Sequence, residues 1–268
     1  MIYCWFADYH SLLPAVFSKI AGKRFYIVLG GYDVTYLEEF NYGSFNKKFR
    51  GSCARYSMRS ATLNLPVARA LGIMARSRAG DIRVKVIPTG DDPEIYLPSH
   101  DKEDVIVTVS LTKNWQRFMI KGIDRFIDLA RKLPAMQFVI IGMSKEGEKC
   151  VSEKSENLLI LPTISHEDLV AWYGKARFYA QFSRSEGLPN AVCEAMLRNC
   201  IPLGTNVGGI PEAMGDAGIV LDDWDADAMA EKIRTCANQD VLANRAREHI
   251  IQNYHTERRE QELLNLMR

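Results

Sequence analysis

Two glutamates eight residues apart, Glu186 and Glu194, bracket the segment of this chain that is best suited to bind a polar ligand. The apolar run Ala176–Phe182 precedes them and is typical of a buried strand. Pro189 suits the first turn of a helix, whose unpaired backbone N–H groups would face whatever lies above the strand end. These donors and the positive end of the helix dipole together favour a bound diphosphate.

The two carboxylates suit the hydroxyl groups of a sugar nucleotide. Glu186 lies in a glycine-containing loop and can accept hydrogen bonds from sugar hydroxyls. Glu194 follows Asn190 by four residues, so the two share a helix face and Glu194 can accept from ribose hydroxyls. The alternative is an ordinary strand–turn–helix unit with two solvated glutamates, since glutamates at this spacing are common.

The sequence around and after this pair resembles a known family. The Glu-x7-Glu spacing, an Ala-Met pair and the stretch Ile-Pro-Leu-Gly-Thr-Asn-Val-Gly-Gly-Ile-Pro-Glu over residues 201–212 resemble the donor-binding domain of retaining family-4 (group 1) glycosyltransferases. In that family a strand follows the helix of the second glutamate, and a Gly-Gly loop then leads to another helix. Lys121-Gly-Ile-Asp, which opens a helix, and the hinge-like Val86-Ile-Pro-Thr-Gly extend the resemblance to about residues 85–235.

The resemblance implies a role for each of these residues. It makes Glu186 a catalytic ligand of the transferred sugar and Glu194 a ligand of the ribose. The other donor-binding residues that it implies form the loop and first helical turn between these two glutamates: Gly187, Leu188, Pro189, Asn190 and Ala191. The nucleotide sugar is a substrate, so no cofactor is expected.

Glycosyl transfer requires stabilisation of the leaving diphosphate as its negative charge grows, a role that fixed cations serve well. Lys121, at a predicted helix start after the first strand of the second lobe, is the first catalytic candidate. Members of the resembled family carry an arginine five residues earlier, where this chain has Gln116, so Arg117 is the second candidate. The alternative is that both are solvated residues at a helix start. Two cations can neutralise a diphosphate by themselves, so no metal is expected.

The first lobe offers three candidates for the acceptor side. Asp8 and His10 follow a predicted strand whose end resembles the family's approach to the acceptor, and they would order acceptor hydroxyls or a proton path. A purely structural histidine is the alternative. The stretch Gly30-Gly-Tyr-Asp33 resembles a strand end that often reads His-Gly-x-Asp in the family. A histidine contact to the donor sugar is therefore missing here, whereas Asp33 is retained and would take part of that role.

Charge is unevenly distributed along the 268 residues, although the formal net charge is only +1. Residues 1–98 contain 13 Lys and Arg against 8 Asp and Glu, whereas residues 99–268 contain 21 against 25. This basic excess fits a peripheral contact with anionic lipid head groups or with a phosphate-linked acceptor, and a plain solvated surface fits it at least as well. Nucleic acid is not an expected partner, because no basic stripe alternates with aromatic residues.

The remaining composition is that of an ordinary globular protein, with 47% hydrophobic and 25% charged residues. The six cysteines show no C-x-x-C pair and no zinc-ligand spacing, which favours a reducing cytosol. No apolar segment approaches the roughly 20 residues of a membrane span, and the first residues lack the basic start of a signal peptide. We therefore expect a cytoplasmic protein, with peripheral contact at the inner face of the membrane as the alternative.

Short apolar strands alternate with amphipathic helices in the second half of the chain, which predicts parallel βαβ units and a doubly wound sheet. The expected strands cover residues 104–109, 137–141, 157–161, 178–182 and 201–205, and the expected helices cover 121–133, 165–175, a segment from 189, 225–237, 240–253 and 256–267. Residues 1–98 are less regular. Strands are expected there over 3–6, 26–29 and 61–65, with a helix over 12–20.

These patterns and the resemblance together predict a GT-B-like α/β protein with two Rossmann-like doubly wound lobes. The N-terminal lobe is expected to be incomplete, because the family's opening strand and glycine-rich loop are not found. The expected domains are a partial acceptor-side lobe over 1–98, a nucleotide-sugar-binding domain over 99–252 and a C-terminal helix over 253–268.

The expected activity is transfer of a hexose, with retention, from a nucleotide sugar to a glycan or lipid-linked acceptor in bacterial cell-surface polysaccharide synthesis. The alternative is a truncated, non-catalytic module that binds the nucleotide sugar. A third class, the NAD-dependent dehydrogenases, is not supported, because no G-x-G-x-x-G motif follows the first strand.

Overall fold

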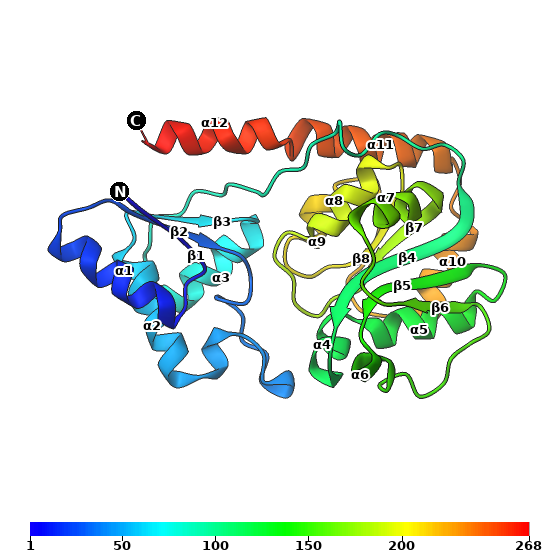
Figure 1. Cartoon of the computed structure of the whole chain (residues 1–268), viewed down its shortest axis with the longest axis horizontal. Coiled ribbons are helices and arrows are strands. Elements are labelled where there is room, and N and C mark those ends of the chain that lie inside the picture. Colours follow the sequence, from blue (N-terminus) through cyan, green and yellow to red (C-terminus); the bar gives the residue numbers. More distant parts are fainter. Residues whose placement is uncertain (268) are drawn as a thin grey trace. The chain divides into compact units, whose positions relative to one another are not determined.

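Residues 1–267 are described by a computed structural model of the chain, shown in Figure 1. They form two compact units. The first unit consists of Met1–Thr89 and Ser185–Leu188, together with the C-terminal residues from Glu262 onward. The second unit consists of Gly90–Arg184 and Pro189–Gln261. The loop that carries Glu186 is therefore grouped apart from the strand and helix that flank it in sequence. The domain boundaries expected from the sequence stay a prediction.

A three-stranded parallel sheet with the order β1-β2-β3 forms the centre of the first unit. Its strands are β1 (Ile2–Trp5), β2 (Phe25–Leu29) and β3 (Leu63–Pro66). β2 is buried at all five positions, because it is apolar throughout and has a strand on each side. The helical elements of this unit are α1 (Tyr9–Ile20), the short 3-10 helices η1 (Glu38–Phe40) and η2 (Ser44–Asn46), α2 (Lys48–Ser60) and α3 (Arg69–Ala79).

A six-stranded parallel sheet with the order β6-β5-β4-β7-β8-β9 forms the centre of the second unit. Its strands are β4 (Glu103–Thr112), β5 (Gln137–Met143), β6 (Leu158–Leu161), β7 (Ala176–Gln181), β8 (Ile201–Thr205) and β9 (Ile219–Leu221). The strand order reverses between β4 and β7, and doubly wound sheets bind their ligands beyond the carboxyl ends of the strands at such a point.

Helices connect these strands and continue to the end of the chain. They are α4 (Trp115–Ile120), α5 (Ile123–Lys132), α6 (Lys145–Glu148), α7 (His166–Lys175), α8 (Asn190–Leu197), α9 (Ile210–Met214), α10 (Ala226–Arg234), α11 (Gln239–Asn253) and α12 (Thr256–Met267). α12 begins in the second unit, and its residues from Glu262 belong to the first.

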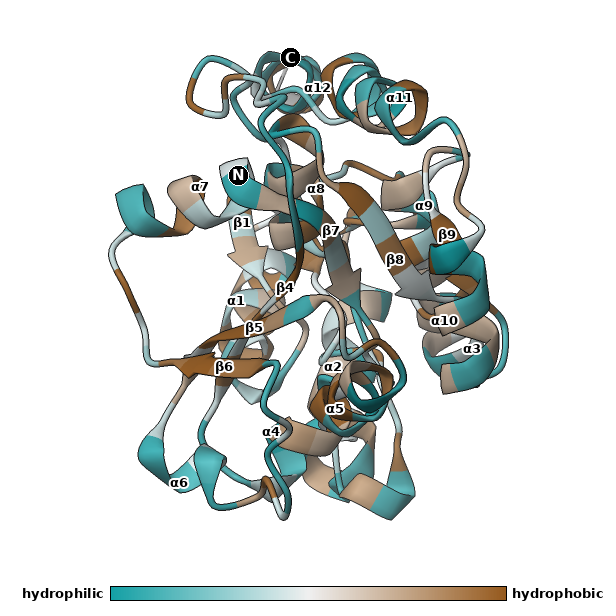
Figure 2. Cartoon of the chain, turned by 90° about the vertical axis from the view of Figure 1, so that its right-hand side faces the viewer, coloured by the Kyte–Doolittle hydropathy of each residue, from teal (hydrophilic) through white to brown (hydrophobic). Residues whose placement is uncertain are grey.

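An apolar core joins α5 and α10 to the sheet of the second unit. Phe126 on α5 meets Phe138 on β5 edge-to-face, with ring centroids 5.1 Å apart, and both side chains are buried. Hydrophobic residues run along β5 and β6 in Figure 2. Buried aromatic pairs of this kind stabilise a core by more than their buried area alone contributes. This pair therefore helps to hold α5 against the sheet.

Most of the predicted elements are confirmed, including the strand Ile201–Thr205 residue for residue. The helix expected over residues 121–133 is wrong at its start, because α4 ends at Ile120 and α5 begins at Ile123. Gly122, between them, has a φ of +67°, a left-handed conformation that interrupts a helix. Pro189 is the N-cap of α8 rather than a residue of its first turn.

Helices α2 and α3 were not predicted. Both are rich in arginine, and their buried faces consist largely of small residues, such as Gly51 and Ala54 in α2 and Gly72 and Ala75 in α3. Hydrophobic periodicity is the main sequence signal for a helix, and small residues contribute little to it. The formation of these two helices therefore depends on their tertiary contacts.

Candidate active site

An arginine after β7 ties together the elements that meet at the reversal point of the second sheet. The Arg184 guanidinium donates to both carboxylate oxygens of Asp124 on α5, at 2.8 Å (Nη1–Oδ1) and 2.6 Å (Nη2–Oδ2). The backbone N–H of Arg184 donates to the carbonyl of Ile120 at the end of α4, at 2.8 Å. Thr205, at the end of β8, donates from Oγ1 to the carbonyl of Ser183 at 3.0 Å. These bonds fix the loop after β7 to the α4–α5 junction and to β8.

Lys121 lies in this junction as the C-cap of α4, and its side chain is half-buried. Its backbone N–H donates to the carbonyl of Arg117 at 3.0 Å. A Cβ on the following Gly122 would lie 2.0 Å from the carbonyl oxygen of Phe182, so only glycine fits this close approach. The backbone of Lys121 is thereby held against the segment that follows β7.

The two arginines near Lys121 differ in their surroundings. Arg117 is exposed on α4, where its backbone N–H donates to the N-cap oxygen of Asn114 at 2.9 Å. Arg184 is half-buried in the junction itself and shares its charge with Asp124. Arg184 was not predicted as a site residue. Its position, directly after a predicted strand and two residues before Glu186, was the signal that was available.

Glu194 is half-buried on α8, four residues after Asn190 at the start of that helix. The Tyr173 hydroxyl on α7 donates a hydrogen bond to its Oε2 at 3.1 Å. Burial raises the pKa of Glu194, and hydrogen bonds from Tyr173 and Tyr96 act in the opposite direction. The carboxylate is therefore partly desolvated and oriented by the protein, as a ligand for hydroxyl groups needs to be.

Three further titratable side chains interact with Glu194. Burial, followed by the nearby charge of Glu194, raises the pKa of Asp91 to about 7. The Tyr96 hydroxyl lies 2.9 Å from Nε2 of His166, and the charge of His166 acts to lower the pKa of Glu194. Asp91 and Tyr96 lie in one segment and His166 in another, and both segments are distant in sequence from Glu194, so no local pattern pointed to them.

The loop that carries Glu186 contacts other residues of the first unit. Ser185 Oγ lies 3.2 Å from Oγ1 of Thr35. Gly187 is buried, and a Cβ there would lie 2.1 Å from the carbonyl oxygen of Gly30, so a side chain is excluded. Glu186 is half-buried and accepts from the backbone N–H of Gly187 through Oε1 at 3.3 Å. The backbone of this loop is therefore closely confined on both sides of Glu186.

Asp33 is almost completely buried, with 1% of its surface exposed. Its carboxylate accepts from the backbone N–H groups of Gly31 at 2.8 Å and of Ala7 at 3.1 Å, and from that of Gly30. Burial raises the pKa of Asp33 to about 6, although these hydrogen bonds oppose the shift. The side chain joins the loop after β1 to the end of β2.

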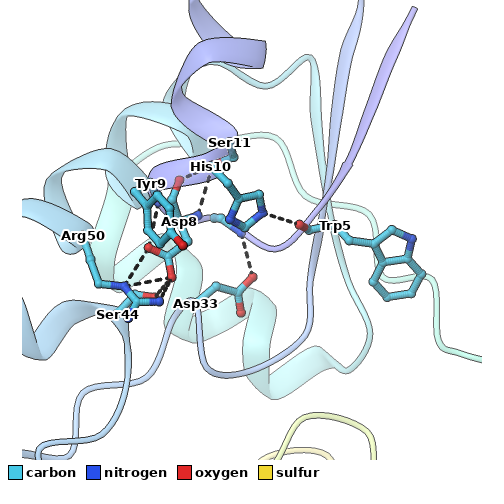
Figure 3. Close-up of polar contacts among 9 residues, drawn as sticks. Trp5, Asp8, Tyr9, His10, Ser11, Asp33, Ser44 and Arg50 are labelled. Atoms are coloured by element: carbon cyan, nitrogen blue, oxygen red, sulfur yellow. Dashed lines mark hydrogen bonds and ion pairs between the residues drawn. The ribbon is translucent and has the colours of Figure 1, made fainter.

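Asp8 is also buried, as the N-cap of α1. It forms an ion pair with Arg50, whose Nε lies 2.9 Å from Oδ1, and Ser44 Oγ donates to Oδ2 at 3.1 Å (Figure 3). Burial alone would raise the pKa of Asp8, but the bonds from Arg50 and from the Tyr9 backbone lower it overall. His10 differs, since it is exposed and its Nε2 lies 2.8 Å from the Trp5 carbonyl.

The part of the chain that the structure describes contains neither a cluster of metal ligands nor a membrane-spanning helix. Within residues 1–267, no group of three or more His, Cys, Asp or Glu side chains is arranged to hold a metal ion. Over the same residues, no helix is both long enough and apolar enough to cross a bilayer.

Comparison with known proteins identifies the family. The family model described as "Glycosyl transferases group 1" matches residues 103–239, which is more than half of the chain. This region includes the whole six-stranded sheet and the site around Lys121 and Glu194. The chain belongs to the group 1 glycosyltransferases. The family that its motifs resemble is thereby confirmed.

Two curated relatives align with part of this glycosyltransferase. The Salmonella typhi Vi polysaccharide biosynthesis protein VipC/TviE is 32% identical over 169 residues, which cover 52% of this chain and 26% of the relative. One of the subunits of the Homo sapiens phosphatidylinositol N-acetylglucosaminyltransferase is 25% identical over 160 residues, which cover 55% of this chain and 32% of the relative. The glycosyltransferase thus spans about a third or less of the length of these proteins.

Solved structures share the fold of this glycosyltransferase over nearly its whole length. Sucrose-phosphate synthase from Thermosynechococcus elongatus superposes with a TM-score of 0.81 at 17% identity, covering 99% of this chain and 72% of the synthase. Anabaena HepE, solved in complex with UDP-glucose, gives 0.80 at 18% identity, covering 99% and 78%. The expected GT-B-like α/β fold with two parallel sheets is confirmed, and the N-terminal sheet is small, with three strands.

The predicted site residues of this glycosyltransferase are divided between the two units. Lys121 lies in the second unit with Glu194 and Asn190, whereas Gly187 and Leu188 are grouped with Glu186 in the first. Asp8 and Asp33 bond to the protein itself, and His10 is the exposed member of the acceptor-side set. The roles of these residues toward a donor or acceptor stay predictions.

Proposed function

We propose that this group 1 glycosyltransferase transfers a hexose from a nucleotide-sugar donor to a glycan or lipid-linked acceptor, with retention of configuration. The observation that carries the proposal is the position of Glu194, half-buried and oriented by Tyr173 within the region that matches the family. The Salmonella typhi relative is named for Vi polysaccharide biosynthesis, which supports a role in bacterial cell-surface polysaccharide synthesis. The complex of HepE with UDP-glucose supports a nucleotide sugar as the donor.

The donor's ribose is the ligand that we assign to Glu194. A ribose offers two neighbouring hydroxyl donors, and a carboxylate has two oxygens that accept them. The hydroxyls of Tyr173 and Tyr96 each take one acceptor position of the carboxylate, and its remaining lone pairs can accept from the ligand. Asn190 and Ala191, at the N-terminal end of α8, supply backbone N–H groups to the donor diphosphate.

The diphosphate leaving group is stabilised by Lys121 in this proposal, together with an arginine. Negative charge grows on the diphosphate as the glycosidic bond breaks, and a cation that is already fixed in place stabilises the transition state without reorganisation. Arg117 was the expected second cation, and Arg184 is a further candidate because it lies in the same junction as Lys121. The leaving phosphate oxygen takes the acceptor's proton on the same face of the sugar, as the family's retaining mechanism implies.

Glu186 is the residue that we assign to the transferred sugar. The tightly packed Gly187 confines its loop, so the carboxylate is presented from a defined backbone position. Leu188 and Pro189 continue this loop to α8. On the acceptor side, His10 is the residue that would meet the acceptor. Asp8 and Asp33 would act by holding the loop that follows β1, since Asp33 accepts from Ala7 and Asp8 is bonded to Ser11.

The acceptor class also bears on where the enzyme works. A lipid-linked acceptor would place the reaction at the cytoplasmic face of a membrane, and the basic first unit would make the peripheral contact. No cofactor or metal is part of this proposal, because lysine and arginine serve the diphosphate.

A second candidate function is a module that binds the nucleotide sugar without transferring it. The observation that favours it is the small sheet of the first unit, which has three strands against six in the second. Both functions require donor binding in the second unit, and only the first requires turnover.

The test combines donor binding with turnover. Thermal unfolding of the full chain is followed with UDP-, GDP- and ADP-hexoses, because a ligand that binds the native state raises the melting temperature. Transfer of labelled hexose to water and to lipid-linked acceptors is measured with the donor that binds. We expect stabilisation by one donor class, together with turnover. Binding without turnover on any acceptor would favour the module.

A matched pair of variants assigns the binding to the site. Glu194→Gln should abolish most of the stabilisation by the donor, because an amide donates as well as accepts and lacks the charge. Glu248→Gln, an exposed position on α11, is the control and should respond like the wild type. Equal responses of the two variants would contradict the assignment of the donor to Glu194.

A further inference from the structure

Helix α1 exposes several large apolar side chains to solvent. Its fully buried residues are small: Ser11, Ala15 and Ser18. Leu12 and Val16 are half-buried. Four large apolar residues face solvent, with exposed fractions between 57% and 80%: Tyr9, Leu13, Phe17 and Ile20. These four residues recur at intervals of four, four and three and so share one face of the helix. We call them the α1 stripe.

Contacts with α2 hold the α1 stripe outward. Ser11 Oγ donates to Oγ of Ser57 on α2 at 2.8 Å, and both side chains are completely buried. The N-cap of α1, Asp8, is bonded to Arg50 of the same helix α2. Turning the stripe toward the core would break this polar contact and the ion pair. A contiguous apolar surface that is held outward in this way marks an interaction site.

Basic residues outnumber acidic ones near the stripe, and the acidic residue next to it in sequence is the buried Asp8, which is paired with Arg50. No Asp or Glu occurs in residues 9–32 or 40–80. Lysines flank both helices in exposed positions: Lys19 and Lys23 at the end of α1, and Lys47 and Lys48 at the start of α2. The Arg50 guanidinium lies over the ring of Tyr9, 5.4 Å from its centroid, and Lys19 Nζ lies over the ring of Tyr56, 4.8 Å from its centroid. Arg50, which is also paired with Asp8, therefore borders the stripe at Tyr9, and Lys19 lies on the same helix as the stripe.

An apolar helix face bordered by lysines matches one kind of partner, an anionic lipid surface. Apolar side chains of such a helix enter the boundary between head groups and acyl chains, while lysines extend their ammonium groups to the phosphates. A second copy of the chain is a poorer match, because facing stripes would bring lysines of like charge together.

We propose that the α1 stripe docks on an anionic bilayer, with α1 lying in the plane of the interface and Lys19 and Lys23 at the lipid phosphates. Phe49, 71% exposed next to Lys48, adds a second apolar contact at the start of α2. The proposal deepens the proposed function and rests on it, since it gives the enzyme a surface from which to reach a lipid-linked acceptor.

The test is co-sedimentation of the full chain with vesicles. Vesicles of phosphatidylglycerol mixed with phosphatidylcholine should bind the protein, and vesicles of phosphatidylcholine alone should bind it much more weakly. Binding should fall as salt is added, since salt screens the attraction of the lysines. Equal binding to both vesicle types, or none to either, would overturn the proposal.

Two pairs of variants separate the apolar and the charged contributions. Leu13→Ser with Phe17→Ser should lower vesicle affinity about tenfold or more, whereas Ile73→Ser, an equally exposed isoleucine on α3, should leave it unchanged. Lys19→Glu with Lys23→Glu should lower it about tenfold or more, whereas Lys232→Glu on α10 should have little effect. All substituted side chains are exposed, and circular dichroism checks that each variant is folded.

Two further measurements keep this proposal distinct from the proposed function. Donor binding is measured on the stripe variants by thermal shift. Retained donor binding with lost vesicle binding supports the proposal, whereas donor binding by a wild type that ignores vesicles overturns the proposal alone. Absence of donor binding in the wild type would instead contradict the proposed function. Light scattering gives the oligomeric state, and a dimer that Leu13→Ser and Phe17→Ser convert to a monomer would assign the stripe to a second copy.

Discussion

The Tyr173 hydroxyl donates to Oε2 of Glu194 across 3.1 Å, joining the buried face of α7 to α8. The Tyr173 side chain is completely buried, and burial raises the pKa of its hydroxyl well above the usual value. The hydroxyl therefore remains a hydrogen-bond donor at neutral pH. It sets the orientation of the carboxylate to which we assign the donor ribose.

Removal of this hydroxyl should weaken donor binding. Tyr173→Phe keeps the ring and deletes the hydrogen bond, which contributes about 0.5–1.5 kcal/mol and more when the acceptor is charged. We expect the dissociation constant of the donor, measured by calorimetry, to rise by about threefold to tenfold. Tyr36→Phe removes a similar bond, from Tyr36 to Glu38 at 3.0 Å in the first unit, and serves as the control. A similar loss of affinity in both variants would contradict a specific role for Tyr173.

The stability of the protein should fall as the pH rises from about 4 to 7. Burial raises the pKa of Asp91 from 3.8 to about 7, and that of Asp33 from 3.8 to about 6. Between these values the native state retains a proton that the unfolded state has lost, so stability declines with increasing pH. Thermal unfolding as a function of pH measures this slope.

The variant Asp91→Asn should flatten that slope, because an amide imitates the protonated carboxyl and does not titrate. At pH 7 and above it should also melt at a higher temperature than the wild type. Asp92→Asn, one residue further along the chain, is the control and should keep the slope of the wild type. An unchanged slope in Asp91→Asn would show that Asp91 does not retain a proton in the native state.

Gly122→Ala should be strongly destabilising. The φ of +67° costs an alanine about 1–2 kcal/mol, and the added Cβ would also lie 2.0 Å from the Phe182 carbonyl oxygen. Gly22 has a similar φ of +59° and nothing within 4 Å of its Cβ position, so Gly22→Ala isolates the cost of the conformation. Chemical denaturation should give a clearly larger loss for Gly122→Ala. Equal losses would mean that the junction relaxes easily and does not hold Lys121 rigidly.

Loss of the Lys121 ammonium should slow transfer more than it weakens donor binding. Removal of one preorganised donor that stabilises developing negative charge costs about 10²–10³ in kcat. We therefore expect Lys121→Ala to lower kcat by roughly this factor, with Lys145→Ala, an exposed lysine on α6, as the control. An unchanged kcat would remove Lys121 from the catalytic machinery.

Two arginine variants should identify the partner of Lys121. Arg184→Ala removes the guanidinium that bonds Asp124. If Arg184 is the second cation, this variant should lower kcat more than Arg117→Ala does. The opposite order would return the role to Arg117, the residue expected from the sequence. Circular dichroism and donor binding distinguish this effect from a general loss of structure.

Local patterns made much of the second unit predictable. The strand Ile201–Thr205 is a short apolar run, and Ser165 caps α7 by accepting from the backbone N–H of Asp168 at 3.1 Å. Such signals depend on neighbouring residues only, so they can be interpreted without knowledge of the fold. The same holds for the position of Glu194 one turn after the start of α8.

The family, the GT-B-like class and the alternation of strands and helices thus follow from the order of residues, because motif spacing and hydrophobic periodicity are local. The orientation of Glu194 by Tyr173, the inward turn of Asp33 and Asp8 and the outward face of the α1 stripe depend instead on how the chain folds. On periodicity alone, the residues of the α1 stripe would be expected to face the core. They face solvent because α1 contacts α2 through its buried residues, with Ser11 bonded to Ser57, and that contact depends on segments far apart in the chain.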